Sequence, residues 1–202
     1  MRRPAALPLA VTALLLVVTP THADTRLPDA APDAAESMPV PVSLQLPLIL
    51  KILTYDRNLD ARSPTELRIG VVVAPNDPSS VRAEIAGGFQ ALANTTVKGR
   101  RLRAVTLEYG SEAQLESAVR TEQVAVLYVA PGNGANIEAL VRVARAQRVV
   151  TTTGVPDYVP LGIAVGIGMQ QDRPQILINL AASRSAGSEF DASLLRVVRI
   201  VR

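Results

Sequence analysis

The chain has 202 residues, of which 48% are hydrophobic and 19% charged, and its formal net charge is +3. This apolar fraction excludes an intrinsically disordered chain, and the length suits one domain with a buried core. The sequence contains no Cys and one His, His22.

Residues 1–23 have the order of a secretory signal peptide. Arg2 and Arg3 precede a mostly apolar stretch at 9–18, and small residues follow up to Ala23. A membrane-spanning helix needs about 20 apolar residues, so the short stretch favours a cleaved signal over a membrane anchor. We therefore expect a periplasmic protein that is cleaved near Ala23. Its net charge would fall from +3 to +1, because two arginines leave with the signal.

The exported chain would also lack His22, and it would then have no His, no Cys and no Trp. These absences exclude Ser-His-Asp and Cys-His nucleophile systems, Cys/His zinc sites and redox dithiols. We accordingly expect no enzyme, no cofactor and no metal site. A hydrolase that uses carboxylates alone stays an alternative, although no local motif pairs two carboxylates. Binding to nucleic acid is also disfavoured, because it depends on clustered Lys and Arg and the exported chain has no basic run.

The folded part is expected to begin after a leader. Residues 24–42 are rich in Pro, Ala and acidic side chains without an apolar period, which predicts a flexible segment. The domain is assigned to residues 43–202. Its first helix is predicted to run to about Arg57, because four apolar residues share one helical face: Leu46, Ile49, Leu50 and Leu53.

From Leu67 onwards, strand and helix patterns alternate. Strands are predicted at 67–74, 101–109, 124–130 and 148–154, and helices at 81–92, 111–119 and 137–144. The chain then has an antiparallel hairpin formed by 162–169 and 175–180, and a terminal helix at 193–201. Helices between successive strands indicate a sheet that is covered on both faces. We expect a single three-layer α/β domain with a mixed, mostly parallel sheet of about six strands.

The end of the first helix is a candidate partner-binding surface. Tyr55, Asp56 and Arg57 place an aromatic ring and two opposite charges beside an apolar run. The alternative is an ordinary helix terminus, where Arg57 interacts with the last carbonyl groups and Asn58 helps to end the helix.

Two loops after predicted strands are weaker candidates for a ligand site. Gly132, Asn133 and Gly134 lie between a strand and a helix, where exposed amides can hold a phosphate or carboxylate. The loop lacks the last glycine of a dinucleotide fingerprint, and the alternative is a tight turn with an Asn cap. Asp157 follows the next strand, where open α/β sheets place their sites, but its surroundings are also typical of a turn.

Arg196 and Arg199 lie at i and i+3 of the predicted terminal helix. An exposed pair of arginines favours an acidic partner, and the alternative is a solvated helix face.

The end of the chain contains a series of short motifs, namely Ile178-Asn179-Leu180, Ala181-Ala182, Ala186-Gly187 and the stretch 193–201, and an earlier turn has the sequence Val97-Lys98-Gly99-Arg100. These motifs are similar to those of the YfiR-like (YfiR/HmsC) family of periplasmic regulators. The resemblance implies a protein that is not an enzyme. Its partner would be the periplasmic domain of an inner-membrane diguanylate cyclase, whose output of cyclic di-GMP it represses, with effects on biofilm formation. An outer-membrane lipoprotein would in turn sequester it.

The sequence departs from the family pattern at two points. Family members often have an aromatic F-x-x-W-P end to the first helix and some have disulfides, whereas this chain has Tyr55-Asp56-Arg57 and no Cys. The chain is therefore interpreted as a divergent branch whose partner can be another sensor, such as a histidine kinase. The sequence does not decide between a monomer and a homodimer. The alternative function is a single-domain periplasmic binder of a small solute.

Overall fold

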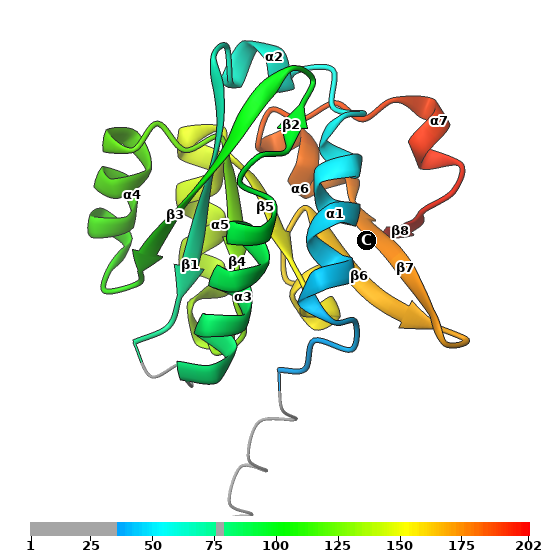
Figure 1. Ribbon diagram of the computed structural model, residues 1–202, viewed down its shortest axis with the longest axis horizontal. Coiled ribbons are helices and arrows are strands. Elements are labelled where there is room, and N and C mark those ends of the chain that lie inside the picture. The colour runs from blue at the N-terminus through cyan, green and yellow to red at the C-terminus, as the bar shows by residue number, and fades with distance from the viewer. Residues whose placement is uncertain (1–35, 76–78) are drawn as a thin grey trace, which may run out of the picture. The chain divides into compact units, whose positions relative to one another are not determined.

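The computed structural model describes residues 36–75 and 79–202 (Figure 1). The predicted signal peptide and residues 24–35 of the predicted leader lie outside the described residues. In the described part, one sheet contains eight strands in the order β2-β3-β1-β4-β5-β6-β7-β8.

Parallel strands form the centre of the sheet. They are β1 (Glu66–Val73), β3 (Arg100–Glu108), β4 (Val126–Val129) and β5 (Val150–Thr153). Next to them, β6 (Val165–Gln170) is parallel to β5 and forms an antiparallel hairpin with β7 (Arg173–Asn179). The edges are the short strands β2 (Thr96–Val97), antiparallel to β3, and β8 (Arg199–Val201), parallel to β7.

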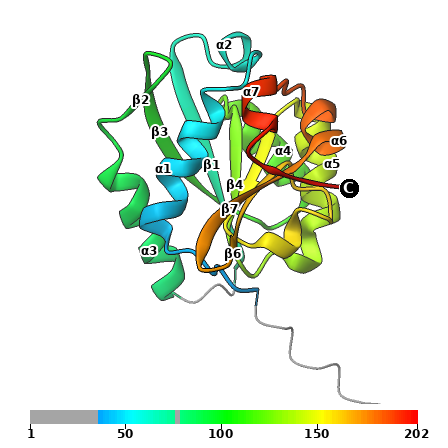
Figure 2. The same ribbon diagram turned by 90° about the vertical axis from the view of Figure 1, so that its right-hand side faces the viewer.

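Helices cover both faces of the sheet, so the domain has three layers (Figures 1 and 2). One face carries α1 (Val42–Leu53) and α3 (Ser79–Ala91), and the other carries α4 (Glu112–Thr121) and α5 (Ile137–Gln147). Short helices connect the other elements: α2 (Leu59–Arg62), η1 (Gly134–Asn136), η2 (Pro156–Tyr158), α6 (Leu180–Ser185) and α7 (Ala192–Leu195). No helix among the described residues has the length and apolar character needed to cross a membrane.

The apolar core is split by the sheet into two clusters. On the α1 and α3 side, Leu46, Ile49 and Phe89 pack against the sheet, and on the other side Leu115 and Leu140 do so. The strands β4 and β5 are buried along their whole length, which explains their continuous runs of β-branched and apolar residues. This architecture confirms the predicted three-layer α/β domain with a mixed, mostly parallel sheet and a late antiparallel hairpin.

The predicted terminal helix at 193–201 is wrong over its second half. The helix α7 ends at Leu195, and residues Arg199–Val201 form β8 instead. Four of the last residues are β-branched, namely Val197, Val198, Ile200 and Val201, and such residues favour strands over helices. Pairing with the free edge of β7 also gives these residues backbone partners. Together with β2, this strand raises the sheet from the expected six strands to eight.

The first helix is shorter than predicted. It ends at Leu53, and residues 54–58 form a turn instead of a last helical turn up to Arg57. The carboxylate of Asp56 accepts a hydrogen bond from the backbone N–H of Asn58 at 3.0 Å, and this local interaction stabilises a turn.

Candidate partner-binding surface

The turn after α1 contacts a segment near the end of the chain. Backbone hydrogen bonds run from the N–H of Arg57 to the carbonyl of Glu189 at 2.9 Å and from the N–H of Asp191 to the carbonyl of Tyr55 at 3.0 Å. The contact thus resembles a minimal pair of antiparallel strands, with a bridge at its centre. We call the two segments, residues 54–62 and 186–191, the junction.

Asp56 lies at the centre of the junction and is fully buried. Its carboxylate accepts hydrogen bonds from the guanidinium of Arg62, the hydroxyl of Ser188 and the backbone N–H groups of Asn58 and Glu189. Burial lowers the pKa of Arg62, while its ion pair with Asp56 opposes that shift. A buried carboxylate is tolerated only when donors of this kind compensate its lost hydration. Asp56 is therefore an internal connector of the junction and is not part of its surface.

Arg57 and Tyr55 differ in how far they reach the surface of the junction. The Arg57 side chain is 56% exposed and reaches Glu189 at 3.4 Å and Asp191 at 2.9 Å. Hydrogen bonds from the backbone N–H of Ser193 and from Arg57 hold the pKa of Asp191 well below its usual range. Tyr55 is half-buried, and the ammonium of Lys51 lies 5.6 Å from the centre of its ring. Arg57 is thus paired with distant acids and not with the last carbonyls of α1.

A pocket of about 380 Å³ adjoins the junction. Its lining combines apolar and charged side chains, among them Asn58, Arg148, Arg184, Glu189, Phe190 and Leu195. The guanidinium groups of Arg148 and Arg184 belong to exposed residues, so this side of the junction presents positive charge. A partner with acidic and apolar groups would complement it.

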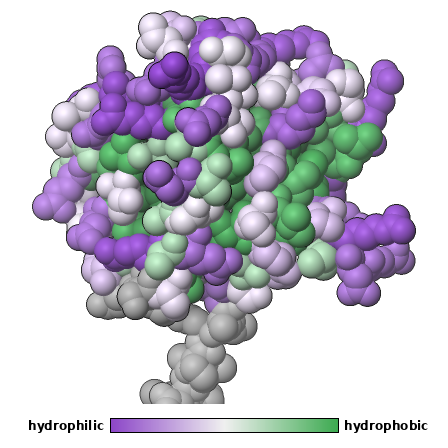
Figure 3. Space-filling model, viewed as in Figure 1, coloured by the Kyte–Doolittle hydropathy of each residue, from purple (hydrophilic) through white to green (hydrophobic). Residues whose placement is uncertain are grey.

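The other predicted partner-binding residues, Arg196 and Arg199, lie on the last segment of the chain and are exposed. Arg199 belongs to the edge strand β8, whose outer side has no neighbouring strand among the described residues. Val197, which follows Arg196, is 75% exposed, and Ile200, which follows Arg199, is 39% exposed. Apolar surface is also visible over β6 and β7 on the same side of the molecule (Figure 3). An open edge strand with exposed apolar side chains is a place where another chain can dock.

The weaker ligand-site residues are only partly brought together. Asn133 is fully buried, and its side-chain amide donates to the carbonyls of Val72 and Ala130, which joins the ends of β1 and β4. The backbone N–H groups of Gly132 and Gly134 point to a carboxylate of this chain, that of Glu36. Asp157 is exposed, whereas its neighbour Tyr158 reaches the loop through a hydrogen bond from the Asn133 N–H at 3.0 Å.

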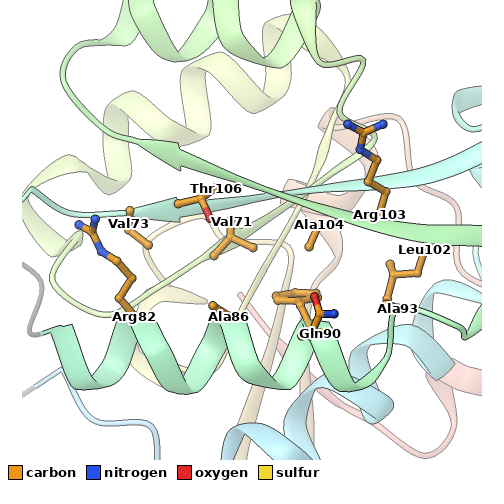
Figure 4. A pocket seen from close by; sticks show the side chains of 11 residues that line it. Val71, Val73, Arg82, Ala86, Gln90, Ala93, Leu102, Arg103, Ala104 and Thr106 are labelled. Atoms are coloured by element: carbon orange, nitrogen blue, oxygen red, sulfur yellow. The ribbon is translucent and has the colours of Figure 1, made fainter.

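A groove that the sequence did not predict lies between α3 and the strands β1 and β3 (Figure 4). Its volume is about 340 Å³, and its lining combines apolar residues such as Val71, Phe89 and Leu102 with polar ones such as Gln90 and Thr106. Arg82 is already engaged there, because its guanidinium donates to Glu108 at 2.8 Å and to the carbonyl of Ala74 at 3.2 Å. Arg103 points away from α3 in this view. The groove thus offers apolar contact area, and of its two arginines Arg82 is already paired while Arg103 is turned away from α3.

Within the described residues, no three His, Cys, Asp or Glu side chains gather in a way that could hold a metal ion.

The sequence model of the YfiR/HmsC-like family (DUF4154) matches residues 43–199. The chain belongs to this family. The assignment confirms the resemblance inferred from the sequence motifs, and it places the chain among periplasmic regulatory proteins of cyclic di-GMP signalling at the level of the family. No curated protein sequence matches the chain.

Solved structures with a similar fold have low sequence identity to this member of the YfiR/HmsC-like family. A conserved domain protein from Vibrio cholerae is 18% identical, with a TM-score of 0.57, and the match covers 80% of this chain and 60% of that one. A ligand-free, open substrate-binding protein with adhesive properties from Clostridium difficile is 14% identical, with a TM-score of 0.51 and coverages of 72% and 57%. An ABC domain from Streptococcus pneumonia in complex with L-Trp is 15% identical, with a TM-score of 0.52 and coverages of 80% and 62%. The chain thus spans about 60% of the length of these proteins, and the likeness shows a shared fold.

The sequence alone did not reveal the residues that complete the junction. Arg62, Ser188, Glu189 and Asp191 have no local motif that connects them to Tyr55 or Arg57. Asp191 gives one signal, since an Asp before Ala-Ser-Leu-Leu is typical of a helix N-cap, and its carboxylate does accept from the Ser193 N–H at 2.9 Å. That signal predicts a helix start and not an ion pair with Arg57.

Proposed function

We propose that this protein is a periplasmic repressor that binds the periplasmic domain of an inner-membrane diguanylate cyclase and thereby lowers cyclic di-GMP and biofilm formation. The observation that carries the proposal is the family match over residues 43–199. The absence of Cys and the presence of only one His, in the predicted signal peptide, support a role in binding and not in catalysis.

The junction supports the proposal with a suitable surface. Tyr55 and Arg57 belong to residue types that are enriched at binding hot spots, and in the turn after α1 Arg57 is exposed and Tyr55 is half-buried. Asp56 fixes the backbone below them through its buried hydrogen bonds. A surface that is held in one geometry loses less conformational entropy when a partner binds. The exposed Arg196 and Arg199 extend the positive charge of the chain end.

Repression across the inner membrane requires a difference in affinity. The protein must bind the inactive state of the partner's periplasmic domain more tightly than the active state, since equal affinity shifts no equilibrium. Sequestration by an outer-membrane lipoprotein would then release the partner. A sensor kinase in place of the cyclase would be controlled by the same physical principle.

The alternative proposal, a single-domain binder of a small solute, draws support from the fold. The printed descriptions of two similar structures name a substrate-binding protein and a complex with L-Trp. The pocket of about 380 Å³ beside the junction has a size suited to a small molecule.

A gene deletion in the native bacterium tests the repressor proposal. We expect the deletion strain to contain more cyclic di-GMP than the parent strain, and reintroduction of the full chain to restore the lower level. A version that lacks residues 2–23 serves as the matched control, because it retains the whole predicted domain but should stay in the cytoplasm. It should fail to restore the level. Unchanged cyclic di-GMP in the deletion strain would contradict the proposal.

A further inference from the structure

The loop after β4 lies at a position where open α/β sheets bind ligands. The chain runs from β1 to β3 on one side and then returns to β4 on the other side of β1. This reversal makes the carboxyl ends of β1 and β4 the topological switch point, outside which ligands of such sheets bind. Asn133 connects the two strand ends through its bonds to Val72 and Ala130.

A carboxylate of the chain itself occupies this loop. Glu36 precedes α1, and its two carboxylate oxygens accept hydrogen bonds from the backbone N–H groups of Gly132 and Gly134, the latter at 2.9 Å. The hydroxyl of Tyr158 donates a further hydrogen bond to the same carboxylate. Glu36 is far from these residues in sequence, so no local turn explains the contact. The loop therefore binds a carboxylate in the same way as it would bind one from solution.

The donors of this loop are well arranged for that purpose. Gly132 has a φ of +81°, a conformation that favours glycine and that helps to turn two nearby N–H groups toward one acceptor. Burial and the neighbouring Glu36 raise the pKa of Tyr158 well above its usual range, so the phenol keeps its proton and remains a donor. The three donors are distributed over the two oxygens of one carboxylate, because Gly132 and Tyr158 donate to one oxygen and Gly134 donates to the other.

A second observation indicates that the loop is not fully satisfied by its own chain. The side-chain oxygen of Asn133 is buried and has no hydrogen-bond partner in the part of the chain that the structure describes. An unpaired buried acceptor is destabilising, and a hydroxyl or amine group beside the carboxylate of a bound molecule would satisfy it. Acetate has no such donor and therefore tests the carboxylate part of the site alone.

We infer that Gly132, Gly134 and Tyr158 form a binding site for small monocarboxylates, and that Glu36 closes this site as an intramolecular ligand. A free carboxylate must displace Glu36, which has the advantage of a high effective concentration, typically about millimolar for a tethered group. The site would therefore bind weakly while Glu36 is in place and more tightly without it. This inference does not depend on the repressor proposal. For the alternative function, a binder of a small solute, it names the chemical class of the solute and the location of its site.

Nuclear magnetic resonance with acetate as the probe tests the inference on protein purified from the periplasm. In the Glu36→Ala variant, the amide proton resonances of Gly132 and Gly134 should move upfield, because a strong acceptor has been removed. Acetate should then move them back with saturation, at a concentration at least about tenfold lower than the parent protein requires. Adding Tyr158→Phe to this variant should weaken the acetate response.

The matched control is Glu138→Ala, which removes a carboxylate from the first turn of α5, next to the same loop, but does not touch the Gly132 and Gly134 amides. It should leave both glycine resonances in place. The inference would be overturned if Glu36→Ala left these resonances unmoved or if acetate gave no saturable shift in that variant. A response to inorganic phosphate as strong as the response to acetate would overturn the assignment to monocarboxylates.

Discussion

Arg57 and Arg142 are similar in their immediate chemistry and different in their position in the fold. Each is about half exposed, and each is paired with two carboxylates. The partners of Arg142 are Glu138, four residues earlier on α5, and Glu112 on the neighbouring helix α4. The partners of Arg57 lie more than 130 positions further along the chain.

The comparison shows that a surface ion pair indicates a binding surface only when the buried contacts beneath it join distant segments of the chain. Beneath Arg142 there is a helix face that α4 and α5 would form without the ion pairs, because their apolar residues already pack together. Beneath Arg57, backbone hydrogen bonds and the buried Asp56 join the end of α1 to the segment before α7. The junction is therefore a place where two distant segments are held in one geometry, as a binding surface requires.

Removal of the buried carboxylate should have the largest effect. We expect Asp56→Ala to lower the free energy of unfolding by about 3–5 kcal/mol, because Arg62 would lose its partner in a buried site. The control is Glu112→Ala, which breaks an exposed pair with Arg142 and should change stability little. Urea denaturation of both variants measures the difference. Equal stability of the two variants would show that the junction does not hold the fold together.

Acidification should weaken the exposed ion pairs of both regions, and the resulting loss of stability should be smaller than the loss caused by Asp56→Ala. The pKa values of Asp191 and Glu112 lie below their usual range, the former mainly through the Ser193 N–H and the latter through Arg142. A carboxylate of this kind stabilises the fold above its unfolded pKa, about 3.9 for Asp and 4.3 for Glu, and this contribution is lost as the pH falls through the folded pKa. Parent and Asp191→Asn proteins should therefore differ most in melting temperature above about pH 5 and progressively less below about pH 4.

The same titration distinguishes the two regions. The gap in melting temperature between the parent and Glu112→Gln should also shrink on acidification, but it should be smaller at every pH. The reason is that Glu112 interacts mainly with Arg142 and not with a backbone amide. A gap between parent and Asp191→Asn that widens on acidification would contradict the assigned interactions.

Local patterns in the sequence were sufficient to predict most of the fold. The strands β4 and β5 and the buried part of β1 from Ile69 to Val73 are continuous apolar or β-branched runs, and the stripe of Leu46, Ile49, Leu50 and Leu53 predicted α1. The failures occurred where a distant contact decides the local structure. Residues 199–201 become a strand because β7 offers a free edge, and the helix period of their apolar residues did not reveal this.

The candidate site was predicted only in its local part. Tyr55 and Arg57 were recognised by residue type, but the burial of Asp56 depends on Arg62 and Ser188, which no motif links to it. Glu36 was assigned to a flexible leader because its neighbours are Pro, Ala and acidic residues, yet its carboxylate meets the amides of a loop almost 100 positions away. Contacts of this kind follow from the tertiary fold and have no signature in local composition.

The most direct test of the partner-binding surface compares two double variants in the strain that lacks the gene. Tyr55→Ala with Arg57→Ala changes the junction. Tyr109→Ala with Arg142→Ala removes a half-buried tyrosine and an arginine with two carboxylate partners from the α4 and α5 side. Cyclic di-GMP is measured in cells that contain equal amounts of each variant in the periplasm. The account predicts that the junction variant leaves cyclic di-GMP high while the α4 and α5 variant restores the low level of the parent. Equal restoration by both double variants would contradict the claim that the junction binds the partner.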